Sequence, residues 1–335
     1  NTREAKEQCT AFEKEINQWF LETFQTNLFA GCGFAECSAS DLKNQPDGSY
    51  QEIFRTITRQ ISERKMNRYT YQDLLYLNEK EQVPGERECK VCRRTDLLRE
   101  DNQCEICWAL EQMAVQIMEN RFFVISSEKK GISLPLPLGR HLTTEKREED
   151  VRQRMKEDPS FIRAYGKNKL NAGCSAAAKL WIGDYHYKTG CSFQDLADCA
   201  QGIERIAVLR ADVDNLGEAF VSGFANEENH NKYVTLSRTS AFSRKLSLFF
   251  KYHINHLLEQ GTFYLEEKED KRRAAVIVYS GGDDLFVVGS WDDILGFAVD
   301  LYYSLKKYSQ GTLTLSAGIG IYPPKFPISV MAKQT

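Results

Sequence analysis

The chain has 335 residues, of which 42% are hydrophobic and 27% are charged, as in ordinary globular proteins. This length is enough for two or three domains, each with its own core. The formal net charge of −3 gives no overall basic footprint for nucleic acid, although a local basic face or basic partner subunits would still supply one. No apolar run approaches the ~20 residues that span a bilayer, and the first residues form no signal peptide. We therefore expect a cytoplasmic protein without membrane contact.

The two ends of the chain share a pattern. Apolar spacing predicts helices over residues 1–24 and 50–66, with a strand over residues 28–37 between them. A helix over residues 294–308 and a Gly-x-Gly-centred strand over residues 313–322 repeat the first helix–strand pair. We interpret this as a weak internal repeat of one α/β module, although the two helix–strand pairs taken alone are better explained by chance similarity. In a true repeat the first copy lacks its opening strands and the second its final elements, so we expect a piece of a longer protein.

Four of the ten cysteines form two Cys-x-x-Cys pairs, Cys89/Cys92 and Cys104/Cys107, with eleven residues between the pairs. In a cytosolic chain this pattern favours a metal over disulfides. Two chelating pairs can place four thiolates at the corners of a tetrahedron, as structural Zn²⁺ requires. Four thiolates would fill the coordination shell, so we predict a closed structural site that staples a small insertion. Two unrelated redox or free pairs are the alternative.

Residues 121–200 have a mixed pattern. Short strands are predicted over residues 122–126, 132–136 and 179–182, and a highly charged helix over residues 145–157. Prolines and charges indicate an exposed α/β connector, in which nothing identifies chemistry.

The last part of the chain opens with a buried-type strand from Ile206 that ends in carboxylates and leads into a helix. On a strand, Asp212 and Asp214 would share a face. However, Asp214 or Asn215 could equally cap the helix, with Glu218 completing a capping box. We therefore predict Asp212 as a metal ligand and leave Asp214 as a cap or as a support for the ligands.

A long helix is predicted over residues 232–259, followed by a short strand over residues 262–266. The helix carries Arg238 and Arg244. Each of them, taken singly, is better explained as part of a solvated basic face than as a phosphate ligand.

Two β-branched and aromatic runs within residues 274–289 flank a Gly-Gly-Asp-Asp tip, which predicts a β-hairpin. Gly281 and Gly282 are expected to supply positive φ angles and to leave the backbone bare. Asp283 and Asp284 repel each other, so a cation would stabilise both ionised forms. Hard oxygen ligands suit Mg²⁺, which commonly bridges carboxylates to phosphates. A turn with solvated acids is the alternative.

The order of a strand ending at Asp212, a helix, the hairpin, a helix and a strand resembles the palm domain of nucleotidyl cyclases and many polymerases. The resemblance implies that Asp212, Asp283 and Asp284 hold two Mg²⁺ (or Mn²⁺) ions, which activate a ribose 3′-hydroxyl and stabilise charge on the phosphates. It also implies that Ser280, Gly281 and Gly282 lie against nucleotide.

Diguanylate cyclases are a poorer match than other members of that group. They carry Gly-Gly-Asp/Glu-Glu-Phe, often with an inhibitory Arg-x-x-Asp upstream. Here the tip reads Gly-Gly-Asp-Asp-Leu, and the upstream quartet from Arg272 to Ala275 lacks the aspartate. This argues against diguanylate synthesis.

Over nearly its whole length the chain resembles the large subunit of type III-A CRISPR (Csm) effector complexes. The matching stretches are residues 36–42, 49–55, the cysteine quartet, and residues 179–185, 209–217 and 279–286. The resemblance implies an α+β fold with tandem ferredoxin-like palm domains, a zinc-binding insertion and a mixed α/β connector. The implied domains are a first, degenerate palm (1–82, its C-terminal part), the zinc insertion (83–120), the connector (121–200) and a second palm truncated at its end (201–335).

The same resemblance implies an activity and partners. Binding of target RNA would switch on conversion of ATP, held between the palms, into cyclic oligoadenylates with 3′–5′ linkages. The partners would be other Csm protein subunits, guide RNA and target RNA. The family's HD nuclease domain finds no match here, and no His-Asp dipeptide occurs, so DNA cleavage is not expected of this stretch. Another nucleotidyl cyclase or polymerase palm, or a non-catalytic scaffold for RNA and proteins, remain alternatives.

Overall fold

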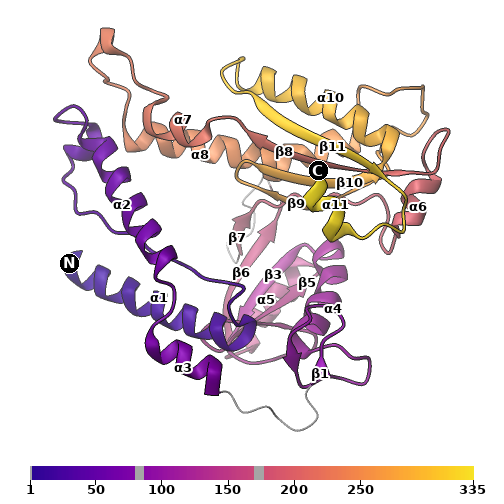
Figure 1. Cartoon of the computed structure of the whole chain (residues 1–335), viewed down its shortest axis with the longest axis horizontal. Coiled ribbons are helices and arrows are strands. Elements are labelled where there is room, and N and C mark those ends of the chain that lie inside the picture. The colour runs from indigo at the N-terminus through magenta and orange to yellow at the C-terminus, as the bar shows by residue number, and fades with distance from the viewer. Residues whose placement is uncertain (1, 80–86, 170–176) are drawn as a thin grey trace. The chain divides into compact units, whose positions relative to one another are not determined.

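The computed structural model describes residues 2–79, 87–169 and 177–335. The chain divides into two compact units (Figure 1). The first unit takes in residues 1–165, 174–178 and 224–236, and the second takes in residues 166–173, 179–223 and 237–335. No helix in the described ranges is long and apolar enough to cross a membrane.

The first unit begins with helices, which are α1 (Thr2–Phe24), the 3₁₀ turn η1 (Asp41–Lys43), α2 (Ser49–Met66) and α3 (Tyr71–Glu79). Helices α1 and α2 lie where the apolar spacing predicts them. Helix α3 was not predicted, because its nine residues are too few to show a clear apolar period.

The strand predicted over residues 28–37 is wrong, since all of these residues are described and none lies in a strand. Side chains of the flanking helices bond the backbone that a neighbouring strand would otherwise pair. Asn17 of α1 exchanges two hydrogen bonds with the backbone of Ala30, at 2.7 and 2.8 Å. Gln60 of α2 does the same with Phe34, at 2.8 and 2.9 Å. The helix–strand repeat is therefore not reproduced in its first copy.

A small cysteine-bearing hairpin and a five-stranded sheet complete the first half of the chain. The hairpin pairs β1 (Arg87–Glu88) with β2 (Thr95–Asp96) and leads into α4 (Glu105–Glu119). The sheet has the order β4-β5-β3-β6-β7. Its elements are β3 (Phe122–Ser126), β4 (Leu134–Leu136), β5 (Arg140–Glu145), β6 (Phe161–Lys167) and β7 (Ala177–Leu180), with helix α5 (Glu148–Glu157) packed on β3 and β5.

Strand β3 has its predicted bounds, while β4, β7 and α5 are each shifted by two or three residues from theirs. Strands β5 and β6 were missed. Each carries several charged or polar residues, and few positions are buried, namely Thr143 in β5 and Ala164 and Gly166 in β6. Half-buried strands of this kind lack the apolar run from which a strand is predicted.

The second unit is built on a four-stranded antiparallel sheet with the order β11-β8-β10-β9. The strands are β8 (Ile206–Val213), β9 (Ala275–Gly281), β10 (Asp284–Ser290) and β11 (Leu315–Tyr322). Helices between β8 and β9, the β9–β10 hairpin, and helix α10 before β11 give the order βαββαβ. This is the ferredoxin-like arrangement expected of a palm.

The predicted long helix is present as α8 (Leu236–Leu248), the π-helical turn η3 (Phe249–His253) and α9 (Ile254–Glu259). Helix α10 (Trp291–Tyr308) and strand β11 also match their predictions to within three residues. The strand predicted over residues 262–266 is wrong. The backbone N–H groups of Thr262 and Phe263 instead donate to the carboxylate of Asp300 on α10, at 3.0 and 3.1 Å.

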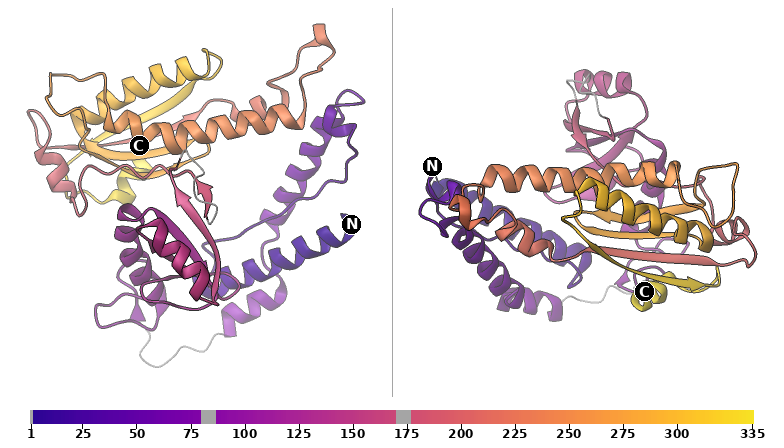
Figure 2. Two further views of the ribbon diagram at one scale, coloured as in Figure 1. Left: turned by 180° about the vertical axis from the view of Figure 1, so that it is seen from behind. Right: turned by 90° about the horizontal axis from the view of Figure 1, so that it is seen from above.

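The sheet of the second unit has two different faces. Helices α8 to α10 cover one face and bury a core that includes Leu209 of β8, Phe250, Ile277 and Phe297 (Figures 1 and 2). Each such fully buried side chain contributes about 1.5–3 kcal/mol to folding. On the other face α6 (Phe193–Asp198) and α11 (Ile328–Gln334) cover only the Ile206 end of β8. The opposite end of that face is open.

Candidate metal and nucleotide sites

The three predicted acidic ligands meet at the open end of this sheet. Strands β10 and β8 pair with Leu285 opposite Ala211, so Asp284 and Asp212 follow on adjacent strands. Asp283 lies at the hairpin tip beside them. One carboxylate oxygen from each of the three lies within 4.8 Å of the others, a spacing at which they can hold cations jointly.

Negative charge accumulates at this cluster. Asp283 is half-buried, and Asp212 and Asp284 are exposed to solvent. Burial of its carboxyl, then a hydrogen bond to Asp284 and the charges of both neighbours, raise the pKa of Asp212 above its ordinary value. A divalent cation would relieve this repulsion, so the donor set suits hard cations such as Mg²⁺ or Mn²⁺.

Asp214 lies outside the cluster and does not cap α7 (Leu216–Ser222). Asn215 at the N-cap has a left-handed backbone and no capping side-chain bond, so the capping box does not form. Asp214 instead accepts hydrogen bonds from the hydroxyls of Thr314 and Ser316, both at 2.6 Å. These bonds lower the pKa of Asp214 and tie the end of β8 to β11.

A cavity of about 410 Å³ opens beside the acids on the same face of the sheet. Asp212 and Asp284 line it together with Arg210, Tyr279 and other residues of β10, β11 and α11. Sequence reasoning missed Arg210 and Tyr279. The i, i+2 spacing of Arg210 from Asp212 would have placed it on the same face.

The two hairpin glycines differ from each other. Gly282 has a φ of +29°, as predicted, and a Cβ atom there would meet no heavy atom within 4 Å. Gly281 belongs to β9 and has no positive φ, so that part of the prediction is wrong. A Cβ atom on Gly281 would lie 2.5 Å from the hydroxyl of Tyr279, so a larger residue would displace the tyrosine.

Ser280 lies on the helix-covered side of the sheet. Its hydroxyl donates a hydrogen bond to the carbonyl of Phe250 in η3. Arg238 and Arg244 are exposed on α8, and neither lines the cavity beside the acids.

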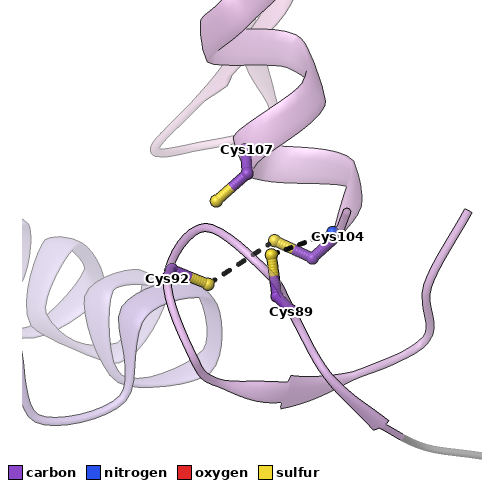
Figure 3. A group of neighbouring side chains, drawn as sticks. All are labelled: Cys89, Cys92, Cys104 and Cys107. Carbon is purple, nitrogen blue, oxygen red and sulfur yellow. Dashed lines mark hydrogen bonds between the residues drawn. The ribbon is translucent and has the colours of Figure 1, made fainter. Parts of the chain in front are cut away.

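The four predicted zinc ligands converge in the first unit. Cys89 and Cys92 lie in the β1–β2 turn, and Cys104 and Cys107 lie at the start of α4, with their side chains pointing toward one another (Figure 3). One sulfur from each lies within 4.8 Å of the others. All four are free thiols, and the 3.8 Å between the sulfurs of Cys92 and Cys104 is too long for a disulfide. This donor set fits a closed tetrahedral Zn²⁺ site.

Hydrogen bonds favour the thiolate form of Cys89, whereas burial raises the pKa of Cys104 and Cys107. Burial opposes ionisation of Cys89, but backbone N–H groups of Cys92, Cys104 and Val91 outweigh it and lower the pKa of that thiol to about 6. The N–H of Cys104 donates to the Cys89 sulfur at 3.3 Å. A metal site requires such deprotonated sulfurs.

Arg94 is a neighbour of the cysteines that sequence reasoning missed. Its guanidinium donates to the sulfurs of Cys92 at 3.4 Å and Cys104 at 3.8 Å. The same group stands 5.5 Å from the ring centre of Phe24 in α1. A buried cation here would offset the negative charge of four thiolates around a bound Zn²⁺, and its contact with Phe24 links the cysteine hairpin to the first helix.

Two family profiles match the chain. The profile of the Cas10/Cmr2 second palm domain matches residues 205–335, and that of Csm1 subunit domain B matches residues 1–80. Proteins named CRISPR system single-strand-specific deoxyribonuclease Cas10/Csm1 (subtype III-A) align along the entire chain. They are 41% identical in Mycobacterium tuberculosis and 38% identical in Streptococcus thermophilus.

Solved structures of lower identity share the fold. A Csm1–Csm4 cassette in complex with one ATP and another in complex with cA4 each superpose with a TM-score of 0.75 at 21% identity. Each match covers 99% of this chain and 42% of the solved chain. The present chain likewise spans 43% of the Mycobacterium relative and 42% of the Streptococcus one. With these matches along its whole length, the chain belongs to the family of Cas10/Csm1 large subunits of type III-A CRISPR systems.

Proposed function

We propose that this chain is the part of a Csm large subunit that converts ATP into cyclic oligoadenylates when the assembled complex binds target RNA. The observation that carries the proposal is the cluster of Asp212, Asp283 and Asp284 at the open end of a palm sheet. Related Csm1–Csm4 cassettes have been solved with ATP and with cA4, which supports a nucleotide substrate and a cyclic product.

In this proposal the three acids hold two Mg²⁺ or Mn²⁺ ions, which supply a polarised 3′-hydroxyl and charge stabilisation at the α-phosphate. Gly282 leaves room for a triphosphate to approach the hairpin backbone, and Gly281 remains a predicted nucleotide contact, although the Tyr279 hydroxyl occupies the space beside it. Arg210 provides a positive side chain in the cavity beside the acids. Ser280 remains a predicted nucleotide contact, although its hydroxyl is bonded to the Phe250 carbonyl.

The other parts of the chain would support this chemistry. We assign Cys89, Cys92, Cys104 and Cys107 to a structural Zn²⁺ site in an insertion at residues 83–120. Residues 1–82 would be the end of a first palm, residues 121–200 a connector, and residues 201–335 the active palm. The proposed setting is a cytoplasmic complex with other Csm subunits, among them Csm4, and with guide and target RNA. The deoxyribonuclease activity in the relatives' names belongs to proteins more than twice as long and is not assigned to this stretch.

The test uses the full-length protein in its RNA-guided complex, with ATP and Mg²⁺, and with or without matching target RNA. Mass spectrometry should detect cyclic adenylates only when target RNA is present. The double variant Asp283→Ala/Asp284→Ala should abolish product and leave assembly intact. Asp270→Ala, which removes an exposed acid of the same unit, is the matched control.

Other outcomes would point to other functions. Cyclic or linear products without RNA would indicate a free-standing cyclase or polymerase. No product from an assembled complex under any condition would indicate a scaffold. Failure of the double variant to assemble would make the hairpin tip a structural element.

A further inference from the structure

An extended segment of the second unit lies along the free edge of the hairpin. The segment (residues 180–187, called the strap below) continues the sheet beyond β9. Ile277 donates its N–H to the carbonyl of Tyr185, and Tyr187 donates to that of Ala275, both at 2.9 Å. Because these bonds satisfy the backbone of an edge strand, the strap fixes where β9 runs.

Asn255 of α9 holds the strap from the helix side. Its side-chain oxygen accepts from the N–H groups of Asp184 and Tyr185, at 2.9 and 3.0 Å, and its amide nitrogen donates to the carbonyl of Ile182 at 2.9 Å. The carboxylate of Asp184 also pairs with Lys167 at 2.6 Å. The side chain of Asn255 therefore ties three residues of the strap, Ile182, Asp184 and Tyr185, to α9.

A β-bulge turns Ser280 toward this helix. Phe286 pairs with Tyr279 but Val287 pairs with Ile277, so Val278 has no partner in β10. Beyond the bulge, Ser280 stands opposite Leu285, whose side chain belongs to the core beneath the helices. Directly opposed residues of an antiparallel pair share a face, so Ser280 faces the helices too.

The hydroxyl of Ser280 ends on the π-helical turn η3, where it donates to the carbonyl of Phe250. In a π-helix the backbone bonds span five residues instead of four, and such turns concentrate near functional sites. This contact joins the strand that carries the Gly-Gly-Asp-Asp tip to the long helix behind it.

Gly183 of the strap closes the other side of Ser280. A Cβ atom on Gly183 would lie 2.6 Å from the Cβ and 3.0 Å from the hydroxyl oxygen of Ser280, and 3.4 Å from a methyl group of Ile254. Real Cβ atoms do not approach other atoms as closely as 2.6 Å, and the Ser280 Cβ is fixed to the backbone of β9. Any larger residue at position 183 must therefore displace the strap or the strand.

We propose that Gly183 and Ser280 are positioning residues for the metal-binding hairpin. Clamped between the strap and the Phe250 carbonyl, Ser280 sets the direction in which the chain leaves β9 toward Asp283 and Asp284. The strap thereby holds Asp283 at the tip from the β9 side and supports Asp284, whose strand β10 is also kept beside Asp212 by the β8–β10 ladder. This inference rests on the proposed function, because it assigns a role within that same site.

The test compares Gly183→Ala and Ser280→Ala with Gly31→Ala in the assembled, RNA-activated complex. A Cβ atom on Gly31 would make only ordinary contacts of 3.4 and 3.7 Å, so this variant controls for the Gly→Ala change itself. Displacing metal ligands by about 1 Å can cost on the order of 100-fold in rate. We expect kcat to fall 10- to 100-fold in both test variants, with the KM for ATP within twofold of wild type. Half-maximal activity should require several-fold more Mn²⁺.

Binding of Mn²⁺ to the assembled complexes, followed by electron paramagnetic resonance, gives a readout that does not depend on turnover. Weaker Mn²⁺ binding in both test variants supports positioning even if the wild-type complex makes no product, an outcome that would overturn the proposed function alone. A Ser280→Ala variant with raised KM and normal kcat would make Ser280 a nucleotide ligand and overturn the inference. Wild-type behaviour of both variants would also overturn it. If Gly183→Ala fails to assemble, the smaller Ser280→Ala change decides by the same criteria.

Discussion

Substitution of Asp212 by Asn should stabilise the protein in the absence of divalent cations. Two unit charges no more than 4.8 Å apart repel by at least about 0.9 kcal/mol in water and about 3.5 kcal/mol at an effective dielectric constant of 20. Asp212 and Asp284 are exposed, so the lower figure applies and the expected gain is about 1 kcal/mol. The raised pKa of Asp212 likewise indicates that its negative charge destabilises the folded protein. Folding disfavours its ionised form, so stability falls as pH rises from the unfolded-state pKa through the raised folded-state pKa.

With divalent cations bound, wild type should instead be more stable than Asp212→Asn. A ligand at 100 times its Kd stabilises the native state by about 2.7 kcal/mol, and most of this should be lost when Asn replaces one of three ligands. The variant should therefore melt above wild type without Mn²⁺ and below it with saturating Mn²⁺. For a unit of this size, 1 kcal/mol corresponds to a shift of about 2–4 °C.

Thermal denaturation with and without Mn²⁺ measures both effects. The metal-free state should be prepared by omitting Mn²⁺, because a chelator would also extract zinc. Asp270→Asn, which alters an exposed acid of the same unit, should leave both transitions unchanged. Equal stabilisation of wild type and Asp212→Asn by Mn²⁺ would refute Asp212 as a ligand, and a metal-free variant less stable than wild type would refute the repulsion argument.

Three further predictions concern stability. Loss of zinc, or the variant Cys104→Ser, should lower the melting temperature of the first unit and leave turnover per assembled complex unchanged. An unchanged melting temperature together with lost turnover would contradict a structural role for the site. Asp300→Ala should cost about 3–5 kcal/mol in urea unfolding, because the fully buried guanidinium of Arg273 would keep only the more distant carboxylate of Asp293, at 3.9 Å, as an ionic partner. A loss no larger than that of Asp270→Ala would show that the ion pair with Asp300 is dispensable. Hydrogen bonds from Lys130 and Ser160 hold the pKa of Asp158 well below its usual range. The ionised carboxylate therefore stabilises the folded protein above the unfolded-state pKa, and this stabilisation is lost as the pH falls through the folded-state pKa. Urea midpoints of Asp158→Asn and wild type should therefore differ at pH 7 and converge in acid, and a constant difference would exclude this linkage.

The parts of the sites that could be predicted from the sequence are those fixed by short-range spacing. Two Cys-x-x-Cys pairs need only a turn and a helix start to bring four sulfurs together, and the structure provides both. Similarly, Asp283 and Asp284 at a hairpin tip need only one neighbouring strand to acquire Asp212. These groups were placed correctly because few backbone conformations can carry such spacings.

The parts that could not be predicted depend on contacts between distant residues. Residues 28–37 have the composition of a strand, yet the side chains of Asn17 and Gln60 bond the backbone that a strand would have paired. Arg94 gains its place beside the cysteines from packing against Phe24, seventy residues earlier in the chain. Neither the side-chain bonds to residues 28–37 nor the contact of Arg94 with Phe24 can be predicted from a local sequence pattern.

The β-bulge decides which residues of the hairpin reach the open face. If β9 paired regularly with β10 from Ile277 onward, Ser280 would stand opposite Asp284 and would face the cavity, as a reading of the sequence by simple alternation implies. The extra residue, Val278, reverses this, so Tyr279 lines the cavity and Ser280 bonds the helix. The acids escape the reversal because Asp212 is placed by β8 and Asp284 by the regular β8–β10 register. The β8–β10 ladder thus decides on which face Asp212 and Asp284 lie, and the irregular β9–β10 ladder decides which uncharged side chains face the cavity and how the tip between the two strands is held.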